Sequence, residues 1–243
     1  MRFVASVLPD YSGKVIYYHD LRADDSNEEG GTKISDFLTH VHAAKDNGFR
    51  FVSSLSELDS SKTLLLTFDD GFNGLWRFRE VLFDEGLKPT VFIAPLLVGK
   101  PGFLTWTEVL DLQRMGFLFQ SHSFSHLPLV DSHISRSKDE LHHELVDSKT
   151  EIENKIGQPV TQICFPRGHF SERVIDACYR SGYKDLFSSL PGSIYSSPSF
   201  RVVARNRAER AMRGEFLAII KGGVIPFREH YVKKQYFPEE ACK

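Results

Sequence analysis

The chain has 243 residues, of which 41% are hydrophobic and 26% are charged, values ordinary for a soluble globular protein with one large domain. Its 30 basic and 32 acidic side chains leave a formal charge of -2, which speaks against electrostatic binding to nucleic acid or to an anionic membrane surface. The three cysteines are too few and too scattered for a disulfide scaffold. Reduced, structural thiols are expected instead.

The apolar runs predict neither a secretion signal nor a membrane span. A short apolar run opens the chain, but Pro9 and Asp10 end it well before the length of a signal-peptide core. No other run approaches the roughly 20 residues of a transmembrane helix. These features predict a cytoplasmic protein without a transmembrane segment, and they leave the oligomeric state open.

Short β-rich apolar runs alternate with segments of helical period along the chain. This alternation predicts repeated βα units and a mainly parallel sheet or barrel. Strands are expected over 14–19, 63–68, 90–94, 117–120, 162–165, 186–188 and 200–203, and helices over 34–48, 75–83, 105–115, 137–156, 171–182 and 207–220. Residues 20–31 read as a polar loop and the stretch from about 231 as a polar tail. No composition break is present, so residues 1–243 are expected to form one domain.

Titratable side chains follow four of these predicted strands. Because ligands of parallel α/β sheets and barrels bind at the carboxyl ends of the strands, these side chains are expected to meet at one rim. They are, in chain order, His19, the pair Asp69 and Asp70, the pair His122 and His126, and the pair Arg167 and His169.

Two of these pairs together indicate a metal site. Neighbouring carboxylates on extended backbone point in different directions, so one of Asp69 and Asp70 can bind metal while the other moves protons, although Asp-Gly is also a common turn. His122 and His126 are four residues apart, which on a helical turn suits one metal ion. Taken alone, this histidine spacing is also frequent at surfaces and in cores. Two imidazoles and a carboxylate leave positions open for water and substrate.

Three short motifs of the chain resemble those of a known family. Thr67-Phe68-Asp69-Asp70-Gly71 followed by His122-x-x-x-His126 resembles the first two motifs of the polysaccharide deacetylases, the NodB-homology or carbohydrate esterase 4 group. The segment 164–168 (CFPRG) is similar to the third motif, and the resemblance covers roughly residues 15–203. It implies a distorted (β/α) barrel of about seven parallel strands in a single domain.

The resemblance also implies roles for these residues. Asp70, His122 and His126 would bind a divalent metal, usually zinc, and Asp69 would be the general base. A metal-bound water has a lowered pKa, and a neighbouring carboxylate can take its proton as it attacks an acetamide carbonyl. The metal and a backbone N–H of the turn at 166–168 would stabilise the oxyanion.

The third motif departs from the family pattern. Arg167 stands where the family usually has tyrosine; it can pair with Asp69, bind an anionic group of the substrate, or be a surface arginine without a role. His169 beside it is a further candidate substrate contact. The predicted substrate-binding residues are therefore Pro166, Arg167, Gly168 and His169.

The general acid also departs from the common pattern. Most members take it from a late Leu-x-His motif, which residues 200–243 lack; His230 is the only histidine there. Some members are circularly permuted, with the acid on a first strand that ends in Tyr-His or Phe-His, and Tyr18-His19 fits that form. We expect His19 to be the acid, with His230 and His169 as alternatives. A strand-end histidine bonded to the following loop is the simplest other interpretation.

The sequence thus predicts a metal-dependent hydrolase that removes an N-acetyl group from an amino sugar of a glycan or saccharide precursor. The predicted cytoplasmic location favours surface-polysaccharide or lipopolysaccharide biosynthesis. An O-acetyl esterase acting on a carbohydrate is one alternative. A catalytically silent carbohydrate-binding homologue is another, since the third motif is altered and the late histidine is missing.

Overall fold

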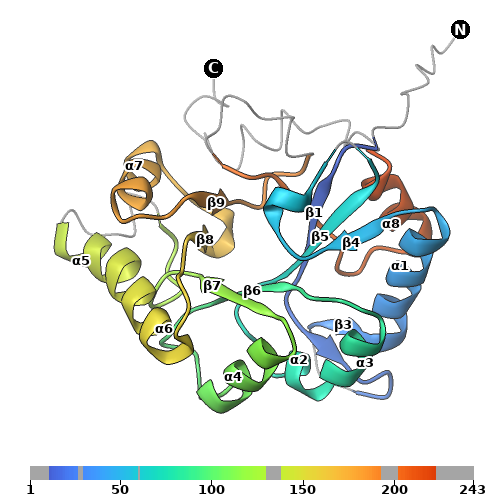
Figure 1. Cartoon of the computed structure of the whole chain (residues 1–243), viewed down its shortest axis with the longest axis horizontal. Helices are drawn as coiled ribbons and strands as arrows, with labels where there is room; N and C mark the ends of the chain where they lie inside the picture. Colours follow the sequence, from blue (N-terminus) through green and yellow to red (C-terminus); the bar gives the residue numbers. More distant parts are fainter. Residues whose placement is uncertain (1–10, 27–29, 60, 130–137, 193–201, 223–243) are drawn as a thin grey trace, which may run out of the picture.

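The computed structural model describes residues 11–26, 30–59, 61–129, 138–192 and 202–222. Its main sheet is parallel throughout, and seven strands follow one another in the order β10-β1-β5-β6-β7-β8-β9 with helices packed around them (Figure 1). These strands are β1 (Lys14–Tyr18), β5 (Thr63–Phe68), β6 (Thr90–Ile93), β7 (Leu118–Ser121), β8 (Gln162–Cys164), β9 (Asp185–Phe187) and β10 (Arg205–Arg207). An eighth, β4 (Arg50–Val52), pairs with β5 beside this path.

Backbone contacts between the two end strands nearly close the sheet into a barrel. Val203, just before β10, forms an isolated parallel bridge with Phe187 of β9. The Ser188 N–H donates to the Val203 carbonyl at 3.0 Å, and the Arg205 N–H donates to the Leu190 carbonyl at 2.8 Å. The expected barrel of about seven parallel strands is therefore confirmed.

The helices lie outside the barrel, and none in the described ranges has the length and hydrophobicity that crossing a bilayer requires (Figure 1). A capping box begins the helix predicted over 105–115, since the Glu108 N–H donates to the Thr105 hydroxyl and the Thr105 N–H donates to the Glu108 carboxylate. The helices are α1 (Ile34–Asp46), α2 (Gly74–Arg77), α3 (Arg79–Asp84), α4 (Trp106–Arg114), α5 (Lys138–His142), α6 (Ser148–Ile156), α7 (Glu172–Arg180) and α8 (Arg213–Ile220), with 3₁₀ turns η1 (Leu55–Glu57) and η3 (Pro166–Gly168) and a π turn η2 (His143–Asp147).

The central strand shows how the core is divided. All six residues of β5 are buried, as expected for a strand covered on both faces. Leu64 and Leu66 belong to the large cluster shared with the helices, whereas Leu65 packs with a second cluster drawn from other barrel strands, including Val15 and Phe92. Because side chains alternate along a strand, Leu65 and Thr67 face the barrel interior.

Two sequence predictions about the site's surroundings are wrong. The polar loop predicted over 20–31 contains β2 (Leu21–Arg22), which pairs with β3 (Thr32–Lys33), and Leu21 is only 1% exposed. The reason is local, because the Asp20 carboxylate accepts the N–H groups of Leu21 and Gly74 and so ties this segment to α2. The helix predicted over 75–83 is divided into α2 and α3 at Phe78.

The C-terminal part of the described chain differs more from the sequence prediction. Residues 205–207 form strand β10, and helix α8 begins only at Arg213, so the helix predicted from 207 starts too early. The sequence Arg-Asn-Arg carries no apolar strand pattern; polar contacts position it, including the Asn206 amide, which donates to the Val15 and Gly192 carbonyls. The strand predicted at 200–203 contributes only the Val203 bridge within the described range. The first residue of the helix predicted over 137–156 and the predicted tail from about 231 lie outside the described residues.

Candidate active site

The Asp-Asp-Gly segment sends its two carboxylates in different directions, as the sequence predicts. Asp69 continues the inward alternation of Thr67 and is 3% exposed. Asp70 and Gly71 then take left-handed backbone with φ of 69° and 76°. A β-carbon on Gly71 would lie 2.8 Å from the Ile93 side chain, so glycine is required here for space as well as conformation.

Three potential metal ligands meet where β5 and β7 end. The Asp70 Oδ1 lies 3.2 Å from His122 Nε2 and 2.9 Å from His126 Nε2, and all three atoms lie within 4.8 Å of one another. We call Asp70, His122 and His126 the metal-ligand group. Burial raises the pKa of Asp70, but the two imidazoles outweigh it and hold that pKa well below its usual range, so Asp70 is an anion.

The hydrogen bonding of this group fits a cation between its atoms. His122 Nδ1 lies 2.8 Å from the Cys164 carbonyl, and because a carbonyl can only accept, Nδ1 carries a proton and Nε2, which faces Asp70, is the ring nitrogen that can bind a metal. Asp70 Oδ1 is a buried oxygen for which the described residues supply no hydrogen bond of good geometry. Electron-pair donors that converge in this way are stabilised by a metal ion.

A second possible group, Asp69, His122 and Cys164, fits a metal poorly. Both Asp69 oxygens already accept hydrogen bonds from Arg205, whose guanidinium is also 2.9 Å from the Cys164 sulfur. A metal ion there would face a fixed cation. Burial raises the pKa of the Cys164 thiol well above its usual range, which keeps it protonated and a poor ligand.

The two histidines are not placed by a helical turn, which corrects the sequence interpretation. Residues 122–126 form a loop with positive φ at Ser123 (62°) and His126 (65°). Glu144 of the π turn η2 holds this loop, accepting the N–H groups of Phe124 and Ser125 at 3.0 Å and the Ser125 hydroxyl. This role cannot be seen in the sequence pattern, because Glu144 reads as one acidic residue of the long amphipathic helix predicted over 137–156.

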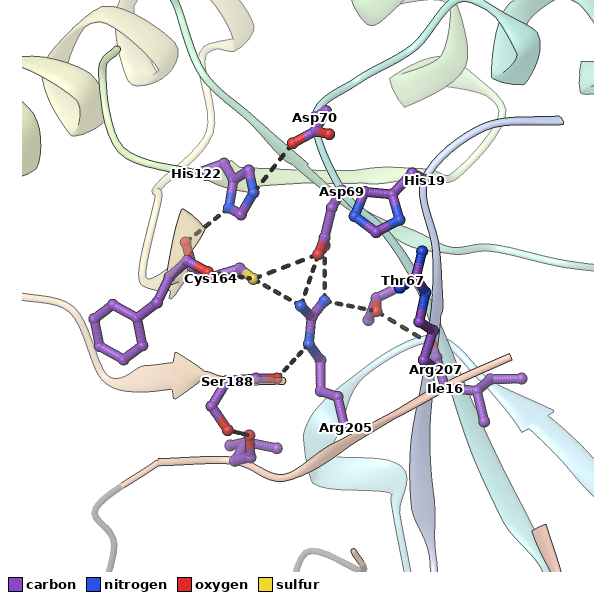
Figure 2. A network of polar contacts seen from close by, with 12 residues as sticks. Ile16, His19, Thr67, Asp69, Asp70, His122, Cys164, Ser188, Arg205 and Arg207 are labelled. Carbon is purple, nitrogen blue, oxygen red and sulfur yellow. Dashed lines mark hydrogen bonds and ion pairs between the residues drawn. The ribbon is translucent and has the colours of Figure 1, made fainter. Parts of the chain in front are cut away.

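Asp69 forms a buried pair with Arg205, not with Arg167 as the sequence allowed. Two guanidinium nitrogens of Arg205 donate to the two Asp69 oxygens at 2.7 Å each, and the arginine also donates to the Ser188 carbonyl and the Thr67 hydroxyl (Figure 2). The Arg205 side chain is fully buried. Burial raises the pKa of Asp69, but Arg205 outweighs it and lowers that pKa below its usual range. Asp69 is therefore ionised.

His19, immediately after β1, forms the second pair. Its Nδ1 lies 2.8 Å from Glu209 Oε1, and its backbone N–H donates to the same oxygen at 2.7 Å. The other oxygen of Glu209 accepts two hydrogen bonds from Arg207. Burial lowers the pKa of His19, but the bond to Glu209 outweighs it and raises that pKa. The partner of His19 is thus distant in sequence and not in the loop that follows the strand.

A cleft of about 270 Å³ joins His19 to Asp70. The third-motif residues do not line it: Pro166 and Gly168 are buried, Arg167 is exposed with a φ of 57°, and His169 is half-buried. Their turn uses the N–H groups of Gly168 and His169 internally, so neither group is available to an oxyanion. His230, an alternative acid, lies outside the described residues.

The fold and site together define a parallel (β/α) barrel with a carboxylate–histidine centre at the carboxyl ends of its strands. The polysaccharide deacetylase family model matches residues 57–186, more than half of the chain, and the chain belongs to this family. The family predicted from the motifs is therefore confirmed.

Individual relatives share only a small part of their sequence with this chain. YxkH of Bacillus subtilis (strain 168), described by its name as a polysaccharide deacetylase, is 24% identical over 209 residues, 82% of this chain and 72% of its own. The Streptococcus pyogenes deacetylase PplD, solved in complex with acetate, superposes with a TM-score of 0.74 at 21% identity, covering 86% of this chain and 98% of that one. IcaB from Ammonifex degensii gives a TM-score of 0.75 at 15% identity, over 87% and 97% of the two chains. Such similarities establish the shared fold.

Proposed function

We propose that this protein is a metal-dependent hydrolase that removes the N-acetyl group from an amino sugar of a glycan or saccharide precursor. The observation that carries the proposal is the convergence of the metal-ligand group beside a separately held carboxylate, Asp69, and a separately held imidazole, His19. The family supports deacetylation of carbohydrates, and the acetate in the related PplD structure is the product expected of this reaction.

Asp70, His122 and His126 would hold the metal, and two imidazoles with one carboxylate favour zinc. A bound divalent ion supplies an acidified water and polarises a carbonyl. Asp69 takes the proton of the attacking water on a carboxylate lone pair that its bonds to Arg205 leave available. The Arg167 N–H is our candidate donor to the developing oxyanion.

The leaving amine needs a proton, and His19 is our candidate donor. Glu209 holds Nδ1, so Nε2 is the ring nitrogen that delivers the proton. Ionised Asp69 and protonated His19 coexist at one pH because Arg205 stabilises the anion and Glu209 stabilises the cation.

The two alternatives receive less support from this geometry. An O-acetyl esterase expels an alkoxide and depends less on a strong general acid, whereas the His19–Glu209 pair is suited to an amine leaving group. A silent binding protein would not need both proton-transfer side chains held in opposite charge states.

The decisive experiment incubates the zinc-loaded protein with an N-acetylglucosamine tetramer and measures acetate release and the mass lost per sugar. Turnover that disappears in Asp69→Asn with zinc still bound supports the proposal. Absence of acetate release from N-acetylated glycans, with release from O-acetylated ones, favours the esterase. Release from neither favours the silent homologue.

The biological setting is a further proposal. A cytoplasmic enzyme of surface-polysaccharide or lipopolysaccharide biosynthesis would act on a precursor before its export. Fractionation of the native host and mass spectrometry of surface glycans from a deletion strain test the two parts separately. Recovery of the protein outside the cytoplasm would overturn the location.

A further inference from the structure

Three arginines line the cleft beside the candidate metal site. Arg22 of β2, Arg207 of β10 and Arg210 line the same cavity of about 270 Å³ as His19 and Asp70. Two sequence-distant segments supply these three cations. Arg207 bonds Glu209, and Arg22 donates to the Ser26 carbonyl at 3.1 Å, so both have partners within the protein; the mechanism proposed above uses neither Arg22 nor Arg210.

The carboxylates that line the cleft already have other tasks. Asp20 accepts the N–H groups of Leu21 and Gly74, Glu209 accepts hydrogen bonds from His19 and Arg207, and Asp70 belongs to the metal-ligand group. Three carboxylates balance three guanidinium groups in the lining, and His19 in its protonated form adds one positive charge, so a divalent ion at Asp70 would bring the net charge of the lining to about plus three.

Arg210 is held in place by its backbone. Its φ of 59° is in the left-handed region, and the next residue, Ala211, is fixed through its carbonyl, which accepts a hydrogen bond from His40 Nε2 at 2.8 Å. His40 is itself buried against Tyr18, the residue before His19. The Arg210 backbone is thus fixed relative to the proposed acid while its side chain stays exposed at the cleft.

From this arrangement we infer that the substrate carries an anionic group next to the acetamido sugar, and that Arg22 and Arg210 bind it. A guanidinium binds a carboxylate or phosphate through paired hydrogen bonds, so either oxyanion fits this chemistry. The carboxylate would belong to a neighbouring acidic sugar and the phosphate to a phosphorylated sugar precursor. This inference rests on the proposed function, because it takes the same cleft as the substrate site.

The test measures binding separately from turnover. Zinc-loaded His19→Gln, which keeps the metal-ligand group and all three arginines, is titrated by calorimetry with three N-acetylated probes. They are a neutral N-acetylglucosamine tetramer, a tetramer that alternates N-acetylglucosamine with glucuronic acid, and N-acetylglucosamine 1-phosphate, the last compared with free N-acetylglucosamine. We expect at least one anionic probe to bind about 10-fold more tightly than its neutral counterpart, and the tighter one identifies the source of the charge.

Arginine variants then locate the effect. Arg22→Gln and Arg210→Gln should each reduce the preference for the anionic probe by about 5- to 10-fold while binding of the neutral probe changes less than about 2-fold. Arg114→Gln is the matched control, because Arg114 is 73% exposed on α4 and does not line the cleft. Raising the salt concentration should weaken only the anionic probe. The kcat/KM of the same arginine variants in the wild-type background provides a second readout if His19→Gln fails to fold.

Equal binding of neutral and anionic probes, or a preference that survives in the Arg22→Gln/Arg210→Gln double variant, would overturn the inference. Acetate release from the neutral tetramer would in that case still support the proposed function. Conversely, an arginine-dependent preference without acetate release from any probe would preserve the anion site and contradict the deacetylase.

Discussion

The candidate active site has two sides, the metal-ligand group and the two proton-transfer pairs, and they differ in how charge is balanced within the chain. In the metal-ligand group, electron-pair donors face one another and the described residues place no cation between them. On the proton-transfer side, each titratable group has a partner of opposite charge, in the Asp69–Arg205 and His19–Glu209 pairs. The first side is organised to receive an ion from outside the chain. The second stabilises the ionised form of one carboxylate, whose pKa is lowered, and the protonated form of one imidazole, whose pKa is raised.

The largest effect is expected from removing a metal ligand, because the site should then lose both its zinc and its activity. Asp70→Ala or His122→Ala is expected to lower zinc affinity more than 100-fold and to abolish turnover, because each removes a direct ligand from a set of three. Elemental analysis after dialysis measures the bound zinc. His142→Ala, an exposed histidine outside the site, is the control. Unchanged zinc stoichiometry in both ligand variants would rule out the metal assignment.

Neutralising the proposed base should lower activity without removing zinc, and so separate the function of the two sides. Asp69→Asn is expected to retain zinc and to lose about 10²- to 10⁴-fold in kcat. It should also unfold more easily, because it leaves the buried Arg205 without its counter-charge, which typically costs about 3–5 kcal/mol. Thermal unfolding and steady-state kinetics measure the two effects.

A double variant distinguishes these losses. Asp69→Asn combined with Arg205→Met removes the uncompensated cation, so stability should recover substantially while activity stays low. Recovery of activity together with stability would show that Asp69 has a structural role only.

Removing the acid should affect one class of leaving group more than another. His19→Ala is expected to slow cleavage of an N-acetyl amide by about 10²- to 10⁴-fold and cleavage of an activated acetyl ester much less, because only the amine requires protonation to leave. The comparison uses kcat on both substrates in wild type and variant. Equal losses on the two substrates would show that another residue, such as His169, is the general acid.

Weakening the acid's partner should shift the pH profile. A general acid works in its protonated form, so activity falls as pH rises through its pKa. Glu209 raises the pKa of His19, so Glu209→Gln should lower that pKa and move the alkaline limb of kcat to lower pH, with a loss of about 10-fold near neutrality. An unmoved limb would show that Glu209 does not tune the acid.

The sequence indicates the reactive side chains on both sides of this comparison but not the residues that hold Asp69 and His19. Asp69, Asp70, His122 and His126 stand in short motifs at the ends of apolar strands, where local pattern and strand topology together place them. The strand β5 is predicted to its exact bounds for the same reason, since continuous burial leaves a continuous apolar run.

The partners of the proton-transfer groups leave no such signal. Arg205 and Glu209 lie 136 and 190 residues from the side chains they hold. Glu209 lies at the start of the helix predicted over 207–220, and Arg205 lies just before it. Only barrel closure brings this segment beside β1, and closure is a tertiary property that local periodicity does not encode. From the sequence, Arg167 is therefore a reasonable candidate for pairing with Asp69. In the structure it is exposed on the turn η3, and Arg205 takes the pairing position.

Glu144 is another functional residue that the helical pattern conceals, and it gives the smallest effect we expect. It belongs to a π turn, an insertion in helical geometry that is frequent at functional sites, and it holds the loop between His122 and His126. Glu144→Gln keeps the size of the side chain but weakens its hydrogen bonds to the loop, so zinc affinity should fall about 10-fold with little loss of kcat at saturating zinc. Zinc titration measures this against Glu140→Gln, a neighbouring exposed glutamate. Equal affinities would show that the metal-ligand group is held by its strands alone.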